Sequence, residues 1–565
     1  MKIAFVCAAF LFLSNLSVAD ETKTAALPVL AARLAAAEAT GSAFVISDET
    51  QFVRNEQRAD ELTVLQQADG SWVAIDYGEA SRNVWLPAVR HLRERVLFLG
   101  QMYRATGRAP YAAAAKKGLD CWLAKRLQNP NWWWNEIGAP QAFGVAAILI
   151  RDTLTAEDRA RYADYLEVSQ IKMAGQNRVW LSRIVLMRGL LRGDAALVDK
   201  AASALASEVC VSDGPEGIAA DWSFRQHGPQ MQFGNYGASF FINLARLANV
   251  FATTPWAFSE EKLDILQNLG EKGFRWTLWN GNMDFSALGR QIVFDAQRKK
   301  AQLIARALAE FEGSGRRFPS DPPTGLRFFP QSAYAVYRPG AWMASVKMHT
   351  HDVLETETWI NGENTLGGHL ADGSLFLYAT GREYENIAPL WKNWRLIPGV
   401  TSYLDLPPVT RPYNEGPGAN EVNEMSATAD RVDFKLQRDG LSVRKSWCFS
   451  PTGVACKGTV AATNAASRVV TCVEHALAAE NARICGYDPE LGCLHVENGC
   501  FVYEIFAPEA AIHATIEERT GDWEGISPPS VGKTVSGRVL QLYIDHGIQP
   551  ELATYDYTVS FRMRK

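Results

Sequence analysis

Apolar and polar positions in the first half of the chain follow the period of an amphipathic helix. Between residues 89 and 103, for example, Leu92, Val96 and Leu99 recur three or four positions apart and so share one helix face. Short polar segments separate runs of this kind, as in arrays of antiparallel helix hairpins. The pattern predicts helices over residues 30–37, 89–103, 111–127, 140–154, 178–191, 195–209, 240–251, 260–278 and 291–311.

The pattern changes after a stretch rich in proline at residues 319–326. Beyond it, short apolar runs stand between polar turns, which is typical of β-strands. We expect strands over 333–337, 344–348, 441–448, 458–462, 469–473 and 539–544. The chain is therefore predicted to be an α+β multidomain protein, with a helical domain over 20–318, a linker over 319–326 and a large antiparallel β-sandwich over 327–565.

The first residues have the composition of a secretory signal. Lys2 precedes an apolar run over residues 3–13 that is too short to span a bilayer, and small residues at 17–19 suit cleavage before Asp20. An uncleaved membrane anchor is the alternative, although no longer apolar run supports it. We expect residues 1–19 to be a signal peptide and the protein to be secreted, either to the periplasm or outside the cell.

Charge and cysteine content narrow the classes of partner. The formal net charge of the 565 residues is −5, so the chain lacks the basic footprint of proteins that bind nucleic acids or membrane surfaces. We expect neither partner, and we expect a monomer.

Eight of the nine cysteines follow the predicted signal, which favours disulfides of unknown pairing. His349 and His351 would share a strand face, but without a third ligand we expect no metal.

Three adjacent tryptophans form the first candidate binding segment, Asn131 followed by Trp132, Trp133 and Trp134. Side chains one and two positions apart point in different directions on any regular element. At least one of these rings should therefore be exposed, where its flat face could stack on a sugar. A buried aromatic cluster is the alternative.

A second group of polar residues surrounds His227 and Tyr236. Nine positions apart, they would lie on opposite faces of a straight helix, but Gly228, Pro229 and Gly234 interrupt any helix and allow a loop to bring them together. Two more candidates stand where predicted helices begin. Asn177 occupies a position where helix capping is the alternative role, and Arg290 opens the helix predicted over 291–311.

These segments together resemble polysaccharide lyase family 8, which includes hyaluronate, chondroitin AC and xanthan lyases. The resemblance covers most of residues 90–405 in order. The segments that carry it are Asn-Trp-Trp-x-Asn-Glu-Ile-Gly-x-Pro from residue 131, Gly-x-Asn-Arg from 175, Ser-Phe-x-Gln-His from 223 with its later tyrosine, Gly-Arg at 289–290, Asn-Gly-Glu-Asn at 361–364 and Asn-Ile-Ala-Pro-Leu-Trp at 386–391.

The resemblance implies an incomplete (α/α) toroid followed by an antiparallel β-sandwich, and an enzyme that needs no metal or organic cofactor. It implies an anionic polysaccharide as substrate. The family's catalytic positions fall on Asn177, His227, Tyr236 and Arg290. Its substrate-binding positions fall on Asn131, Trp132, Trp133, Glu363 and Asn364.

Such a lyase removes the C5 proton of a uronate and expels the oxygen on C4. Asn177 and His227 can neutralise the uronate carboxylate, which favours the enolate-like intermediate. Tyr236 is the candidate base and, once protonated, the acid that serves the leaving oxygen. Because an ordinary tyrosine has a pKa of about 10, Arg290 close to its oxygen would help the ionised form.

Two positions depart from the family pattern. A second arginine, common four residues after the first, is replaced by Phe294, and Trp222 replaces the usual glycine before Ser223. One positive charge fewer argues against a sulfated polymer. We therefore expect an unsulfated polyuronate such as polymannuronate, the mannuronate part of alginate, with a glycosaminoglycan (hyaluronan or chondroitin) as the alternative.

Two other functions remain open. A glycoside hydrolase would use two carboxylates, for which Glu136 and Asp221 are available, but the Tyr, His, Asn and Arg set would then have no role. A non-catalytic glycan-binding protein would need only the tryptophan patch and a basic cleft.

Overall fold

The structure, a computed structural model, describes residues 2–40, 49–407 and 417–563. The chain forms two compact units and passes between them more than once. The helical unit comprises Met1–Cys210, Ile242–Leu266 and Ala309–Arg316, and the sheet unit comprises Val211–Phe241, Gln267–Leu308 and Arg317–Lys565. Residues 211–241 and 267–308 thus pack with the strands, although they precede the predicted linker.

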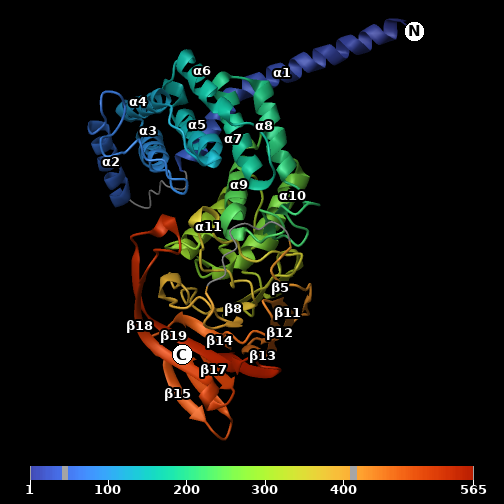
Figure 1. The fold of residues 1–565 in the computed structure, drawn as a ribbon. Coiled ribbons are helices and arrows are strands. Elements are labelled where there is room, and N and C mark those ends of the chain that lie inside the picture. Colours follow the sequence, from blue (N-terminus) through green and yellow to red (C-terminus); the bar gives the residue numbers. More distant parts are fainter. Residues whose placement is uncertain (1, 41–48, 408–416, 564–565) are drawn as a thin grey trace. The chain divides into compact units, whose positions relative to one another are not determined.

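The helical unit contains helices joined by short loops, as the apolar spacing predicts (Figure 1). Its helices are α1 (Lys2–Ala39), α2 (Glu49–Val64), α3 (Phe98–Thr106), α4 (Ala109–Lys125), α5 (Ala139–Leu149), α6 (Ala156–Tyr165), α7 (Gly175–Arg192) and α8 (Ala195–Glu208). Nearly every residue of α5 is buried, so α5 lies in the core of this unit. Thr155 and Asp158 form a capping box that opens α6.

Two of the later helices are shorter than predicted. α9 spans Ala238–Phe251, and α10 (Glu260–Asn268) ends early because a π-helical turn and a 3-10 turn replace its last part. α11 (Ala296–Glu312) starts after the predicted position, since Gly289 and Asp295 adopt left-handed backbone that no α-helix accepts. Arg290 therefore lies in irregular backbone ahead of α11 and does not open it.

The sheet unit consists of antiparallel sheets. Its main strands are β5 (Gly325–Phe329), β6 (Tyr334–Arg338), β7 (Met343–Lys347), β8 (Ser374–Tyr378), β9 (Thr401–Tyr403), β10 (Met425–Ala427), β11 (Arg431–Arg438), β12 (Leu441–Ser450), β13 (Gly453–Ala462), β14 (Arg468–Leu477), β15 (Arg483–Asp488), β16 (Cys493–Asn498), β17 (Phe501–Phe506), β18 (Ile512–Asp522), β19 (Thr534–Ile548) and β20 (Ala553–Phe561). The predicted strands are confirmed in β6, β7, β12, β13, β14 and β19. β5 begins inside the predicted linker.

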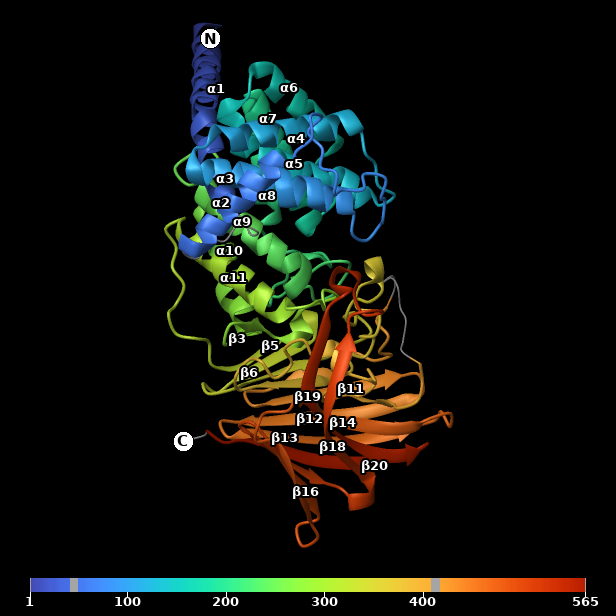
Figure 2. The same ribbon diagram turned by 90° about the vertical axis from the view of Figure 1, so that its left-hand side faces the viewer.

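Three sheets share one core (Figure 2). Their strand orders are β10-β11-β12-β13-β20-β17-β16-β15, β18-β19-β14-β9 and β5-β6-β7-β8. On β12, Val443 and Trp447 are buried while Arg444 is exposed, whereas every residue of β6, β7 and β8 is buried. The buried residues of all three sheets form one continuous cluster, which is the packing of a β-sandwich.

The cysteines are not paired. All eight that follow the predicted signal are free, so the disulfide prediction is wrong for the described chain. The register of β12 and β13 explains one candidate pair, since Cys456 lies opposite Trp447 and therefore points to the other face of the sheet from Cys448. Cys472 is buried in β14, on a different sheet.

The two histidines considered for metal binding also separate. Both follow β7 in a turn, so they do not share a strand face. His349 is buried with its Nε2 2.9 Å from Asp372, and His351 is exposed beside Asp352. Within the described residues, no group of three or more His, Cys, Asp or Glu side chains could hold a metal ion. Across the same residues, no helix is both long enough and apolar enough to cross a membrane.

Candidate active site

Two unusual backbone segments bring His227 and Tyr236 together. His227 follows β2 (Phe224–Arg225) with a φ of 60°, and Gly228 continues this left-handed turn. Tyr236 lies in a π-helical turn, Phe233–Gly237, directly before α9. The two rings lie edge to face with centroids 4.8 Å apart. The glycine-rich segment thus makes the two rings converge, through a π-helical turn where the sequence predicts a loop.

Gly234 makes the close packing of this turn possible. A Cβ at this position would lie 2.6 Å from the carbonyl oxygen of Ala287 and 2.7 Å from the Cα of Leu288. Both contacts are to backbone, which cannot move away without displacing the segment that precedes Arg290. Glycine is therefore needed two residues before Tyr236 for steric reasons.

Arg290 connects Tyr236 to two carboxylates. Its Nη2 donates to the Tyr236 hydroxyl at 3.3 Å, its Nη1 donates to Glu357 at 2.6 Å, and its Nε donates to Glu363 at 2.7 Å. All four side chains are buried. The expected proximity of Arg290 and Tyr236 is present, but the guanidinium is shared among three groups.

Glu357 is the residue that the sequence analysis missed. Its Oε1 lies 2.5 Å from Nδ1 of His227, and its Oε2 accepts from both Arg290 and Gln232. A carboxylate on Nδ1 holds the proton on that nitrogen and leaves Nε2 of the ring for another partner. The available signal was a buried run of alternating Glu and Thr at residues 355–358, which two residues separate from the Asn-Gly-Glu-Asn motif.

The electrostatics of the cluster differ from the expectation for Tyr236. Burial raises the pKa of Tyr236 above its ordinary value; Arg290 opposes this, but Glu357 and Glu363 add to it. Burial also raises the pKa of Glu363. Burial would do the same for Glu357, but Arg290 and His227 outweigh it and lower the pKa to about 2. Glu357 is therefore the ionised partner of Arg290, and Tyr236 is neutral in the free enzyme.

Two residues of the Asn-Gly-Glu-Asn motif form hydrogen bonds with this cluster. Glu363 binds Arg290, as described, and the amide of Asn364 donates to the backbone oxygen of Glu357 at 2.8 Å. Asn364 has no exposed surface. In the structure it positions Glu357, and its contact with substrate stays a prediction.

The remaining predicted residues lie in the helical unit. Asn177 is the third residue of α7, so the alternative of helix capping is wrong. Its side chain is 9% exposed, and its Oδ1 has no hydrogen-bond partner among the described residues. Asn131 stabilises the tryptophan segment, because its side-chain NH₂ donates to the backbone oxygen of Arg82 and its side-chain oxygen accepts from the backbone N–H of Trp133.

The three tryptophans divide as the sequence predicts. Trp132 is 41% exposed, Trp133 is half-buried and Trp134 is buried. The rings of Trp133 and Trp134 meet edge to face at 5.1 Å. A π-helical turn, Trp134–Gly138, begins at the third ring. Trp132 is therefore the ring that is free to meet a ligand.

Neither carboxylate considered for a hydrolase is available as a catalytic group. Asp221 accepts from the backbone and hydroxyl of Ser223 and from the backbone of Gln331, so its oxygens are used within its turn. Glu136 pairs with Lys172 at 2.5 Å.

Trp222 has a φ of 70° in the same turn as Asp221, which accounts for glycine at this position in the family pattern.

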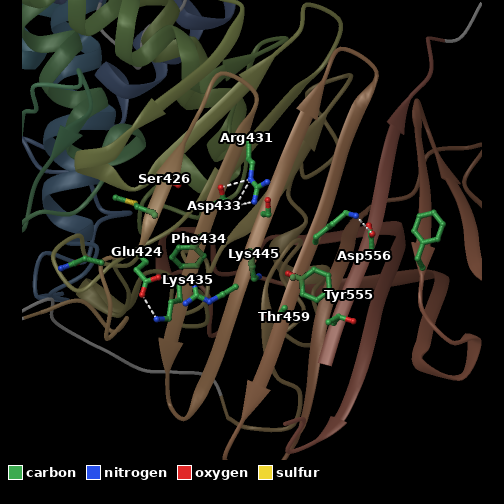
Figure 3. Close-up of a pocket in the computed structure, with 18 residues that line it drawn as sticks. Glu424, Ser426, Arg431, Asp433, Phe434, Lys435, Lys445, Thr459, Tyr555 and Asp556 are labelled. Atoms are coloured by element: carbon green, nitrogen blue, oxygen red, sulfur yellow. Dashed lines mark hydrogen bonds and ion pairs between the residues drawn. The ribbon is translucent and has the colours of Figure 1, made fainter. Parts of the chain in front are cut away.

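A groove of about 870 Å³ on the outer face of the eight-stranded sheet contains none of these residues (Figure 3). Most of its charged side chains pair with one another: Arg431 with Asp433, Lys435 with Glu424, and Lys457 with Asp556. Lys445 instead donates to the backbone oxygen of Gly399. A surface whose charges are satisfied internally has no convergent group for chemistry. The His227 cluster is therefore the candidate active site.

Comparisons with known proteins identify the family and the fold of the chain. The chain matches the models of the polysaccharide lyase family 8 N-terminal alpha-helical domain over residues 53–315 and of the family's super-sandwich domain over residues 324–563. It is 28% identical to chondroitinase-AC of Pedobacter heparinus over 580 residues, which covers 94% of this chain and 81% of that protein. It is 25% identical to hyaluronate lyase of Thermasporomyces composti, with 88% and 74% covered.

The fold is also that of a solved enzyme. A structure of chondroitinase AC lyase, studied in complexes with oligosaccharides, matches with a TM-score of 0.83 and 25% identity over 95% of this chain and 83% of the other. The predicted fold class, a helical toroid followed by an antiparallel β-sandwich, is thereby confirmed.

Proposed function

The chain belongs to polysaccharide lyase family 8 and is a polysaccharide lyase, and we propose that it cleaves a uronate-containing polysaccharide by β-elimination at Tyr236. The observation that carries the proposal is the buried cluster in which His227, Tyr236 and Arg290 meet Glu357 and Glu363. It contains the groups that an elimination needs and places two of the rings within 5 Å.

His227 would bind the uronate carboxylate. Glu357 keeps Nδ1 of its ring occupied, so Nε2 is the nitrogen left for substrate. Hydrogen bonding at the carboxylate favours the charge that develops when the C5 proton leaves. The buried oxygen of Asn177 without a partner supports a ligand role for that residue as well, because buried polar groups are normally satisfied.

Tyr236 would take the C5 proton and return a proton to the C4 oxygen. The phenol is neutral in the free enzyme, so the ionised form must be reached within the cluster. Arg290 is the cation that favours it, and the two carboxylates oppose it. The balance among these three groups would set the pH at which the enzyme works.

For the polymer, we propose a glycosaminoglycan with a glucuronate residue, as the names of the chondroitin and hyaluronan relatives suggest. Polymannuronate is the second candidate, favoured by Phe294 in place of an arginine. Glucuronate and mannuronate share their configuration at C4 and C5, so one Tyr236 could serve both.

Ultraviolet absorbance during incubation with chondroitin, hyaluronan, polymannuronate and glucuronan, each alone, tests the proposal. A rise from the new double bond, lost in Tyr236→Phe, supports elimination and names the polymer. New reducing ends without absorbance would indicate a hydrolase. Binding without either product would indicate a glycan-binding protein. N-terminal sequencing of protein collected outside the producing cells tests our further proposal of secretion after removal of residues 1–19.

A further inference from the structure

The position that lacks the family's second arginine is surrounded by positive charge in the folded chain. Lys299 has its Nζ 5.6 Å from the centre of the Phe294 ring, and Lys533 has its Nζ 5.8 Å from the same centre. Lys299 lies in the first turn of α11, whereas Lys533 lies in the loop between β18 and β19. An ammonium within about 6 Å of an aromatic ring is attracted to it.

Hydrogen bonds hold both lysines at Phe294. The backbone N–H of Phe294 donates to Ser530 Oγ at 2.8 Å, which ties the loop of Lys533 to this segment. Lys299 Nζ donates to the carbonyl oxygen of Phe294 at 3.2 Å. The position of Lys533 beside Phe294 therefore depends on a contact between segments that lie far apart in the sequence.

Neither ammonium forms a salt bridge in the described residues, although the charge of Lys299 contributes to the lowered pKa of Asp295. In the parts of the chain that the structure describes, neither Lys299 nor Lys533 makes an ion pair, and both are exposed. The adjacent Arg298, by contrast, pairs with Asp295 at 2.5 Å. Two exposed cations without a salt bridge attract an anion from solution more strongly than cations held in ion pairs do.

The location connects this charge to the active site. Phe294 follows Arg290 by four residues, and four residues span at most about 14 Å. A polysaccharide held at Tyr236 extends over several sugar units and so can reach a cationic group at that range.

We propose that Lys299 and Lys533, gathered around Phe294, form a subsite that binds an acidic group of the polysaccharide, either a uronate carboxylate or a sulfate ester. The inference rests on the proposed function and adds to it two residues that recognise the negative charge of the substrate. With these two lysines beside Phe294, the loss of the arginine no longer leaves this position without positive charge, and so it no longer argues against a sulfated polymer.

The variants Lys299→Gln, Lys533→Gln and their combination test the subsite. An exposed unit charge at about 4 Å contributes about a factor of five in binding, so the double variant should raise KM about 25-fold and change kcat less than twofold. The difference should shrink in high salt. Lys457→Gln is the matched control, because Lys457 is exposed and lies in the groove of paired charges.

Measurements on sulfated and unsulfated polymers distinguish a sulfate ester from a uronate carboxylate as the group that the subsite binds. A penalty confined to chondroitin 4-sulfate or 6-sulfate would assign a sulfate ester, and an equal penalty on unsulfated chondroitin and polymannuronate would assign a carboxylate. An unchanged KM in the double variant, or the same rise in Lys457→Gln, would overturn the subsite. If the wild type cleaves no polymer, the proposed function fails; calorimetric affinity for chondroitin sulfate, compared between wild type and double variant, then decides the subsite alone.

Discussion

Glu357→Gln is the most informative substitution in the active site because it removes one charge and keeps the side-chain size. Glu357 is 2% exposed, and its two oxygens meet His227 at 2.5 Å and Arg290 at 2.6 Å. A glutamine offers one oxygen, and its NH₂ group would face the other donor. The variant should therefore lose stability and turnover together.

The lowered pKa of Glu357 gives the size of the effect on stability. Burial opposes ionisation, but Arg290 and His227 hold the pKa at about 2, against an ordinary value of 4.5. At about 1.4 kcal/mol per pH unit, the gap between these values is worth about 3 kcal/mol. Because the folded-state pKa is the lower one, this stabilisation is complete above pH 4.5 and disappears as the pH falls toward 2.

Urea unfolding at pH 7 and at pH 3, followed by tryptophan fluorescence, measures this difference. Wild type should exceed Glu357→Gln by about 3 kcal/mol at pH 7 and by clearly less at pH 3. The kcat/KM of the variant should fall about 100-fold, since His227 loses the partner that orients it. Glu355→Gln, two residues away, is the control for activity. Equal unfolding free energies at pH 7, or a difference that does not shrink at pH 3, would refute the reasoning.

Four further predictions concern the site and the core. The raised pKa of Tyr236 means that kcat/KM should increase with pH; Glu363→Gln removes a carboxylate that raises this pKa, so the pH–rate profile should move to lower pH, and a move to higher pH would contradict the assignment. Gly234→Ala sets a methyl against the backbone of Ala287 and should cost about 1–3 kcal/mol of stability in thermal unfolding, together with most of the activity; unchanged melting and turnover would show that the segment yields. Trp132→Ala should raise KM several-fold at constant kcat, because this exposed ring can only bind, and a fall in kcat alone would argue otherwise. Reducing agent should leave the melting temperature unchanged, since the eight described cysteines are free, and a lower melting temperature would reveal a disulfide.

Local sequence pattern was sufficient for the regular elements. Apolar residues spaced by three and four placed α4, α7 and α8, and short apolar runs between polar turns placed β6, β12 and β14. The helix predicted over 89–103 is instead a π-helix, Ala88–Leu97, followed by α3. Patterns of this kind fail where backbone is irregular. The start of α11 was predicted too early, since the left-handed residues Gly289 and Asp295 leave no trace in hydrophobic spacing.

The family motifs pointed to His227, Tyr236 and Arg290, which the structure brings together, but they did not point to the partners of these residues. Glu357 lies 130 positions after His227 along the chain and touches it only through the packing of the sheet unit. Arg290 acts to lower the pKa of Tyr236, as the sequence analysis expected, but burial and the carboxylates of another segment outweigh it and raise the pKa.

Position 294 separates most clearly what can be predicted from the sequence from what depends on the folded chain. The sequence by itself determined that a phenylalanine replaces a charged residue there, and hence that this position contributes no charge of its own. Only the tertiary structure decided that Lys299 and Lys533 bring two charges to the same place. Electrostatic potential depends on distances through space, and a chain folded into packed sheets sets those distances with contacts that sequence separation does not reveal.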